Sequence, residues 1–528
     1  MRKFLIKSVL VIFGAGALLT WFKGGGDLLG SGGALGLDDS AGWTAANSHK
    51  PEVMDTLDAA SVGMMRVELP WNAVELSPGV FAWEAETDDG YIDYHDLFNR
   101  MRQRGIQPVV VLSGGPTYLN HLYPQQPVFT DDLLANWEDF VDAAVEEFGV
   151  DVDHWQVGGV INDPTDWGRV LFPDDENALA APDAALYARM LVSAHSVIKS
   201  AQAGDTVFSG ELAMDGDCAY HPVNYLAALN AEKVWYALDG FNIGLPILED
   251  TPETVIVDEC GTLPAQLSGI PAADSLRAIV ETVDEYADKP VWVHNLRFSQ
   301  EILKNAALER GTISEAIASD YLARMSALLL SYGKAERVFW AFEPLRNTPG
   351  LVAMQTFANL NGNLGVRFDG ASTPAGSDAI ALRFRGGGKL AIMAWTVNSG
   401  ADLSPVLVSD VEGYDLLAYS ADSDSVRDKD GVPLPVDDGG NTALMIGERP
   451  VLITGRPDDI KQTVTQTVQD GAQAAKTGVQ NKLAGWLAAQ KTRAADRISD
   501  WIADQQTSLM NSLRSSLQEW LRESLGLA

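Results

Sequence analysis

The chain has 528 residues, of which 46% are hydrophobic and 21% are charged, and its formal net charge is −34. This length allows two or three domains with a large core. So acidic a chain repels phosphate backbones, which excludes nucleic acid as an expected partner. The charge is uneven, because residues 460–528 carry eight Lys and Arg against six Asp and Glu, a net charge of +2. Two charge regimes predict two different roles within one chain.

The N-terminus places Arg2, Lys3 and Lys7 before or within an apolar run over residues 4–22. Basic residues ahead of an apolar segment hold the N-terminus in the cytoplasm and direct the chain beyond that segment outward. The run approaches the roughly 20 residues that a spanning helix needs. We therefore predict a signal anchor, a transmembrane helix over residues 1–23, with a Gly-rich linker over 24–34 and an extracytoplasmic body at the cell membrane. Cleavage near residues 15–17, which would give a secreted protein, is the alternative.

Between residues 35 and 349, short β-like runs alternate with helical stripes. One stripe spaces Leu133, Trp137, Phe140 and Ala144 by three and four residues, as an amphipathic helix does. Eight such strand–helix units predict an α/β fold, a (β/α)8 TIM barrel, with its active face at the carboxyl ends of the strands. The predicted strands are 35–37, 64–68, 107–112, 154–157, 207–209, 240–243, 290–293 and 337–341.

After residue 350 the pattern changes to short strands. Two alternating runs flank Gly386-Gly387-Gly388, which predicts a hairpin. A small antiparallel, β-sandwich-like domain is therefore expected over residues 350–456. From 457 to 528, apolar residues at helical spacing include Trp486, Trp501 and Trp520 and predict an amphipathic helical tail. Residues 460–528 of this tail would bind a membrane surface or a protein partner, or pack on the chain's own domain.

Cys218 and Cys260 are the only cysteines, and their spacing predicts no zinc site. In an exported body the two would form a disulfide; the alternative is a pair of buried thiols. The seven histidines have no metal-ligand spacing such as His-Glu-x-x-His. No metal and no cofactor are expected.

The segment MMRVELPWNAVELSPGVFAWE, residues 64–84, resembles the second strand of clan A glycoside hydrolases, the cellulase and β-xylosidase kind. The matching features are Arg66, Trp71, Glu75, the Pro78-Gly79 turn and the aromatic-x-Trp at 81–83. Segments 91–119, 137–149 and 289–293 resemble later parts of the same barrels, so the resemblance covers roughly residues 35–455. It implies cleavage of glycosidic bonds with retention of configuration, and a β domain after the barrel.

In this family a glutamate on strand four is the acid/base and a glutamate on strand seven is the nucleophile, about 5 Å apart. Aligned on Trp155 of the segment HWQVGG, the acid position falls on Val160. Aligned on the Lys-Pro pair at 289–290, the nucleophile position falls on Asn295. Valine holds no proton to donate and an amide is a poor nucleophile, so the resemblance implies a glycosidase fold without its catalytic pair. A shift of three residues would instead place Asp163 in the acid position.

The sequence thus predicts a glycoside-hydrolase-like pseudoenzyme at the cell envelope, with a carbohydrate-binding role or a structural role in assembly. Polysaccharide, the membrane and a protein partner are its expected contacts. The alternative is an active retaining hydrolase that uses displaced carboxylates. The candidate contacts at the barrel mouth are Arg66, Glu68, Trp71, Asn162, Asp163, Glu211, His294, Asn295, Trp340 and Glu343.

Overall fold

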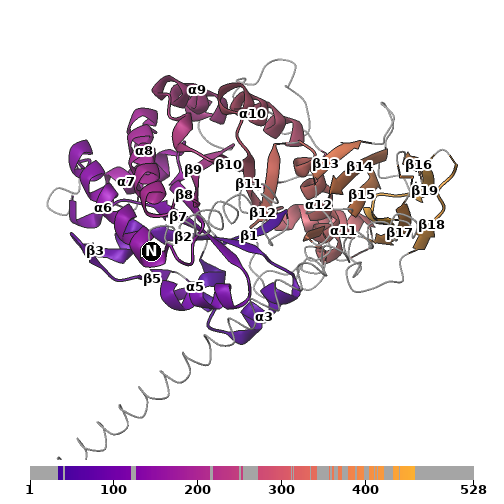
Figure 1. The fold of residues 1–528 in the computed structure, drawn as a ribbon, viewed down its shortest axis with the longest axis horizontal. Helices are drawn as coiled ribbons and strands as arrows, with labels where there is room; N and C mark the ends of the chain where they lie inside the picture. Colours follow the sequence, from indigo (N-terminus) through magenta and orange to yellow (C-terminus); the bar gives the residue numbers. More distant parts are fainter. Residues whose placement is uncertain are drawn as a thin grey trace, which may run out of the picture. The chain divides into compact units, whose positions relative to one another are not determined.

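The computed structural model describes most of residues 34–457; the longest stretches within that span that it leaves out are 254–271, 342–355 and 421–431. Eight parallel strands close into a barrel with the helices outside it (Figure 1). Each of the eight predicted barrel strands overlaps one of them, which confirms the predicted α/β barrel. In barrel order the strands are β1 (Leu35–Asp38), β2 (Met64–Pro70), β7 (Gln107–Ser113), β8 (His154–Val160), β9 (Thr206–Ala213), β10 (Gly240–Gly244), β11 (Val291–Leu296) and β12 (Ala335–Trp340).

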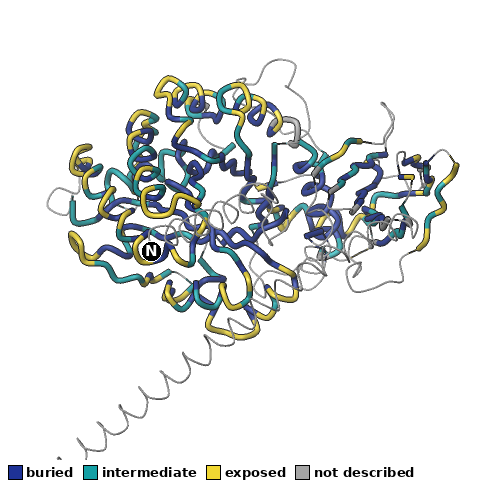
Figure 2. Tube along the Cα trace, viewed as in Figure 1, coloured by how far each residue is buried: buried dark blue, intermediate teal, exposed yellow. Residues whose placement is uncertain are grey.

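The helices surround the barrel, and most of them bury one face, so that buried and exposed positions alternate along them in Figure 2. In α12 (Ser314–Leu330), none of the described positions is exposed. In α6, the predicted stripe of Leu133, Trp137 and Phe140 is fully buried. Two small hairpins follow β2 and precede β7 in the chain. The first pairs β3 (Glu75–Ser77) with β4 (Val80–Phe81), and the second pairs β5 (Glu84–Thr87) with β6 (Gly90–Asp93). The helices are α2 (Trp43–Asn47), α3 (Pro51–Ala59), α4 (Trp71–Val74), α5 (Tyr94–Gln103), α6 (Thr130–Phe148), α7 (Pro164–Leu171), α8 (Ala184–Ala201), α9 (Pro222–Glu232), α10 (Ala272–Ala287), α11 (Gln300–Arg310) and α12 (Ser314–Leu330).

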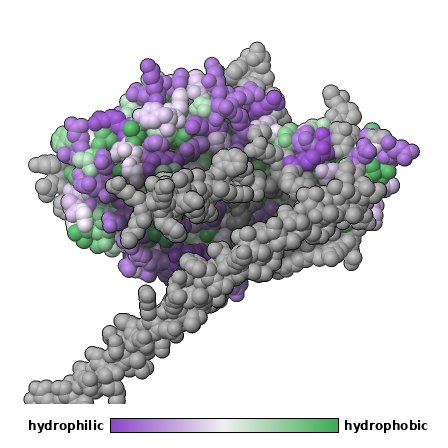
Figure 3. Space-filling model, in the orientation of Figure 1, coloured by the Kyte–Doolittle hydropathy of each residue, from purple (hydrophilic) through white to green (hydrophobic). Residues whose placement is uncertain are grey.

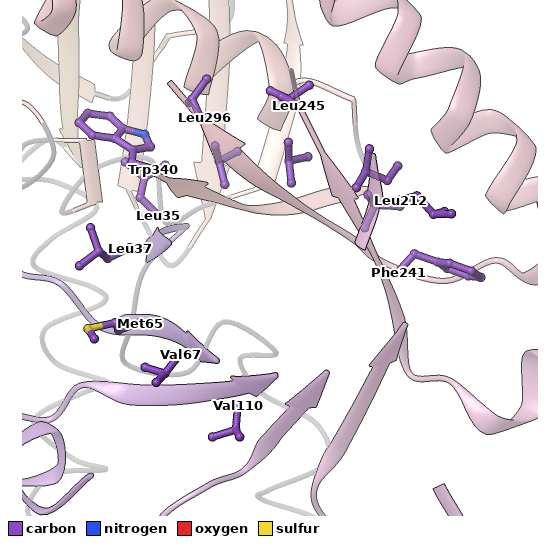
Figure 4. Close-up of a cluster of buried hydrophobic side chains, with 14 of the residues drawn as sticks. Leu35, Leu37, Met65, Val67, Val110, Leu212, Phe241, Leu245, Leu296 and Trp340 are labelled. Atoms are coloured by element: carbon purple, nitrogen blue, oxygen red, sulfur yellow. The ribbon is translucent and has the colours of Figure 1, made fainter. Parts of the chain in front are cut away.

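Successive side chains of each strand point to opposite sides of the barrel wall. One set packs in the main hydrophobic core: Figure 4 shows Met65 and Val67 of β2 among apolar side chains from most of the other strands. The alternate set faces the barrel interior. Its lower layer is a separate apolar cluster in which the rings of Phe208 and Trp292 stack with centroids 3.8 Å apart. This layer closes the bottom of the barrel, so a site can form only above it.

The β domain follows the barrel. The predicted hairpin is confirmed: β14 and β15 pair antiparallel, with Gly386 opposite Lys389 at the turn. The last strand ends at Pro457, one residue past the predicted boundary. Strands β13 (Arg367–Ala371), β14 (Ala379–Gly386), β15 (Lys389–Thr396), β20 (Val451–Pro457), β17 (Tyr414–Ser420) and β18 (Val432–Leu434) form one sheet in this order, and β16 (Ser404–Val408) pairs with β19 (Thr442–Ile446).

In the space-filling view of Figure 3, hydrophilic residues cover much of the described surface of the barrel. Across the described helices, none combines the length and the apolar character that crossing a bilayer requires. The predicted anchor over 1–23 and the tail from 458 onward lie outside the described residues, as do Cys260 and the side chain of Cys218. The anchor, the tail and the disulfide therefore stay predictions.

Candidate functional site at the barrel mouth

A buried ion network fills the centre of the barrel above the apolar layer. Arg66 of β2 reaches Asp38 Oδ1 with Nη1 at 2.9 Å and Glu211 Oε2 with Nη2 at 3.1 Å. Its Nε donates to Gln156 Oε1 at 2.9 Å. Burial opposes the ionisation of Asp38, but the charge of Arg66, the nearby His294 and the hydrogen bonds from Arg66 and the backbone of Asn295 together outweigh it, so the pKa of this carboxyl lies below its usual value. Asp38 and Glu211 thus share one cation.

His294 of β11 lies beside this network as a neutral ring. It is fully buried, and its Nε2 lies 2.7 Å from Asn242 Oδ1. Burial and the nearby Arg66 charge lower the pKa of His294 to about 3. The ring is therefore neutral near neutral pH and cannot act as an imidazolium acid.

The two positions that the resemblance assigns to catalysis hold no carboxylate. At the end of β11, Asn295 donates from its side-chain Nδ2 to Leu245 O at 2.8 Å, and its backbone N–H donates to Asp38 Oδ2 at 3.0 Å. Its φ of 61° lies in the left-handed region, where Asn is one of the few residues tolerated. The Asn295 side chain is thus committed to the backbone. At the end of β8, Val160 presents only an apolar side chain.

A carboxylate from the next helix occupies the space beside Val160. Asp166, in the first turn of α7, accepts a hydrogen bond from Val160 N at 2.5 Å through Oδ2. A Cβ atom on Gly159 would lie 2.5 Å from the same oxygen. The absence of a side chain at Gly159 therefore admits the Asp166 carboxylate to the end of β8. Asp166 was not among the residues predicted from sequence.

Asp166 lines a pocket of about 270 Å³ at the carboxyl ends of β2, β7 and β8. Glu68 of β2 also lines it and accepts a hydrogen bond from Ser113 Oγ at 2.5 Å. Burial, with repulsion from Glu68 in support, raises the pKa of Asp166 to about 6. The remaining lining residues are Pro70, Asn72, Gly114, Gly159, Arg169, Val170, Pro173 and Asp175. This is a polar pocket on the face where TIM barrels place their sites.

The structure corrects the expected role of the two tryptophans. Trp71 and Trp340 are fully buried rather than presented at the mouth. Trp71 stacks on Phe140 with centroids 5.2 Å apart, and Trp340 donates from Nε1 to Ser326 Oγ at 3.0 Å. Neither ring offers a face for stacking on a sugar.

Two of the predicted polar contacts, Asn162 and Asp163, form hydrogen bonds within the protein. A third, Glu343, cannot be placed. Asn162 is fully buried and ties the end of β8 to Ala213 of β9 through hydrogen bonds in both directions. Asp163, the residue that a shifted alignment places in the acid position, caps α7 and accepts from Thr165 N at 2.7 Å. Glu343 lies outside the described residues. Of the predicted carboxylates, Glu68 lines the pocket and Glu211 belongs to the ion network.

Asp166→Asn is expected to change how stability depends on pH. The folded state holds the Asp166 proton more tightly than the unfolded chain does, so the stability this group contributes is complete below its ordinary pKa of 3.8 and is lost as pH rises through about 6. The variant has no group that titrates at this position. The free energy of unfolding of the variant, minus that of the parent, should therefore be higher at neutral pH than at acid pH, by up to about 3 kcal/mol. Urea unfolding across this pH range measures the difference. Asp131→Asn, at a 95% exposed side chain, is the matched control, and an equal profile for all three proteins would refute the buried state of Asp166.

Comparisons with known proteins agree with this architecture. No protein-family model matches the chain, and no curated protein matches it. Among solved structures, a family 39 glycoside hydrolase from the gut symbiont Bacteroides cellulosilyticus is similar over 80% of this chain and 81% of its own, at 17% identity and a TM-score of 0.56. A β-xylosidase from Caulobacter crescentus is similar over 82% of this chain and 98% of its own, at 15% identity and a TM-score of 0.50.

A family 30 subfamily 8 xylanase from Clostridium acetobutylicum is also similar, over 80% of this chain and 96% of its own, at 10% identity and a TM-score of 0.50. The chain thus shares the parallel eight-stranded barrel fold of these clan A glycoside hydrolases. This confirms the fold that the resemblance implied. At these identities the likeness concerns the fold alone, and function has to be argued from the site.

Proposed function

We propose that the chain is an exported, membrane-anchored, glycoside-hydrolase-like protein that binds carbohydrate at the barrel mouth and does not catalyse the retaining reaction. One observation supports the proposal: the positions that the resemblance assigns to the acid and the nucleophile hold Val160 and Asn295, near the ends of β8 and β11. The nearby buried carboxylates, Asp38 and Glu211, are both bound to Arg66. Both carboxylates are thus committed to a buried ion pair, which supports a structural role for them.

The pocket at β2, β7 and β8 supports a binding role. It combines carboxylates, the hydroxyl of Ser113 and the amide of Asn72, groups that hydrogen-bond to sugar hydroxyls. The export signal and the apolar tail in the sequence support a place at the cell envelope. Through the tail, residues 460–528, the protein would meet the membrane surface or a protein partner.

Calorimetric titration of the detergent-solubilised full chain with neutral and charged oligosaccharides tests the binding role. We expect saturable binding without turnover, weakened by Asn72→Ala, which removes one side chain from the pocket. Asn305→Ala, at an exposed position on α11, should leave the affinity unchanged. A full chain that binds no glycan, yet retains a co-purifying protein only while residues 460–528 are present, would establish a purely architectural role instead.

A second candidate function rests on Asp166 and Glu68. Both line one pocket, and the pKa of Asp166, raised to about 6 by burial, suits a general acid. Hydrolysis would then use displaced carboxylates: Asp166 would protonate the leaving oxygen while Glu68 took a proton from the attacking water. Release of a sugar of inverted configuration, followed by NMR and abolished in Asp166→Asn, would favour this function over the first.

A further inference from the structure

The pocket at the barrel mouth is unevenly charged. Three carboxylates line it, those of Glu68, Asp166 and Asp175, against the single guanidinium of Arg169. We propose that this pocket selects an amino sugar with a free, protonated amine over neutral and acidic sugars. The inference rests on the proposed carbohydrate-binding function and names its ligand class.

Among the described residues of the lining, the one cation is already paired. Arg169 Nη1 lies 3.2 Å from Asp166 Oδ1, so its charge largely cancels that of Asp166. Glu68 and Asp175 then remain as net negative charge facing the pocket. Their described hydrogen-bond donors are neutral: Ser113 Oγ for Glu68, and the backbone N–H of Asn177 for Asp175. These groups orient the carboxylates without neutralising them, which leaves their charge for a ligand.

Arg66, a second cation that interacts with Glu68, is also committed. Arg66 attracts Glu68 electrostatically, but its guanidinium spans Asp38 and Glu211 at 2.9 and 3.1 Å. The network beneath the pocket therefore has two carboxylates for one cation and adds negative potential to the mouth. In this partly enclosed setting, opposite charges attract far more strongly than in bulk water.

The size and charge of the pocket fix the ligand class. Its volume of about 270 Å³ lies just below the range from about 300 Å³ upward that is typical of drug-sized ligands, which suits a single sugar ring. A uronic, sulfated or phosphorylated sugar would bring a like charge beside Glu68. An ammonium group on the ring would instead make charge-assisted hydrogen bonds to the carboxylates, while the hydroxyls keep the contacts available to any sugar.

The test compares a glucosamine trimer with its N-acetylated counterpart, because the two share a backbone and differ in the charge of the amine. Calorimetry on the full chain near pH 6.5 keeps most Asp166 ionised and, with amine pKa values about 8, most amines protonated. We expect the free amine to bind about tenfold more tightly, the effect of one charge-assisted hydrogen bond. Glu68→Gln should abolish this preference, and its circular dichroism spectrum, unchanged from that of the parent, verifies folding.

Glu285→Gln, at an exposed residue of α10, is the matched control and should keep the full preference. Equal or tighter binding of the N-acetylated trimer would overturn the ligand class while leaving the proposed function standing. If Glu68→Gln and Glu285→Gln reduce the preference for the free amine equally, the ligand class is also overturned, since the preference would then reflect the general acidity of the chain. If neither trimer, nor a neutral xylose or glucose oligomer, binds at all, the proposed function itself fails.

Discussion

Arg66→Met is expected to lower the free energy of unfolding by about 3–5 kcal/mol, the usual cost of removing one partner from a buried ion pair. The methionine fills much of the arginine's volume, so the loss comes mainly from Asp38 and Glu211, which would stay buried without their cation. Urea denaturation of the full chain at neutral pH measures it. Arg277→Met is the control, because Arg277 pairs with Glu281 on the surface of α10 and should cost less than about 1 kcal/mol.

A triple variant separates the charge effect from a general disturbance of the barrel. Arg66→Met combined with Asp38→Asn and Glu211→Gln removes all three charges, so much of the lost stability should return. A triple variant as unstable as Arg66→Met alone would show that packing, rather than unpaired charge, causes the loss. A stable Arg66→Met variant would contradict the buried network altogether.

Arg324→Met is expected to have an effect of similar size at the contact between barrel and β domain. Glu253, in the segment after β10, accepts hydrogen bonds from Arg324 Nε of α12 at 2.8 Å and from Trp395 Nε1 of β15 at 2.7 Å. The side chain of Arg324 is 2% exposed and that of Glu253 is 8% exposed. The substitution would leave the Glu253 carboxylate buried with only a neutral donor, at a cost of about 3–5 kcal/mol.

Thermal unfolding of the full chain, followed by circular dichroism, measures the loss of stability. Trp395→Phe removes one hydrogen bond and keeps the cation, so a smaller loss of about 1–2 kcal/mol is expected. Arg189→Met, at an exposed pair with Asp131, should change little. A larger effect for Arg189→Met than for Arg324→Met would exclude Glu253 as the link between the two parts.

The barrel could be predicted from sequence because each strand is a short apolar run buried in the wall, as in Val109, Val110 and Val111 of β7. The hairpin in the β domain was equally predictable, since three glycines between two alternating runs leave few other folds. Trp71 and Trp340 were predicted at the barrel mouth but lie in the core, and this difference has a physical reason. An aromatic residue near a strand end fits a sugar platform and a core position equally well, and only the packing of Trp71 on Phe140 decides between them.

Asp166 escaped prediction because its role depends on a contact that sequence spacing does not show. An acidic residue in the first turn of a helix is ordinarily explained by the helix dipole. Here the turn after β8 folds back so that Asp166 meets the backbone of Val160. The signal that could have found it is Gly159, because a Cβ there would collide with the Asp166 carboxylate. A glycine at the end of β8 thus makes room for the carboxylate of Asp166.

The proposed absence of retaining hydrolysis can be tested most directly by placing a glutamate at each of the two positions that the resemblance assigns to catalysis. Full-length protein should release no sugar from aryl glycosides or cell-wall polysaccharides above the rate of a buffer blank. Neither Val160→Glu nor Asn295→Glu alone should exceed that rate, because retention needs both groups about 5 Å apart. We predict that the parent is inactive and that any gain in the rate of sugar release is confined to the double variant. Turnover by the parent with retained configuration, lost in Glu211→Gln or Glu68→Gln, would contradict it.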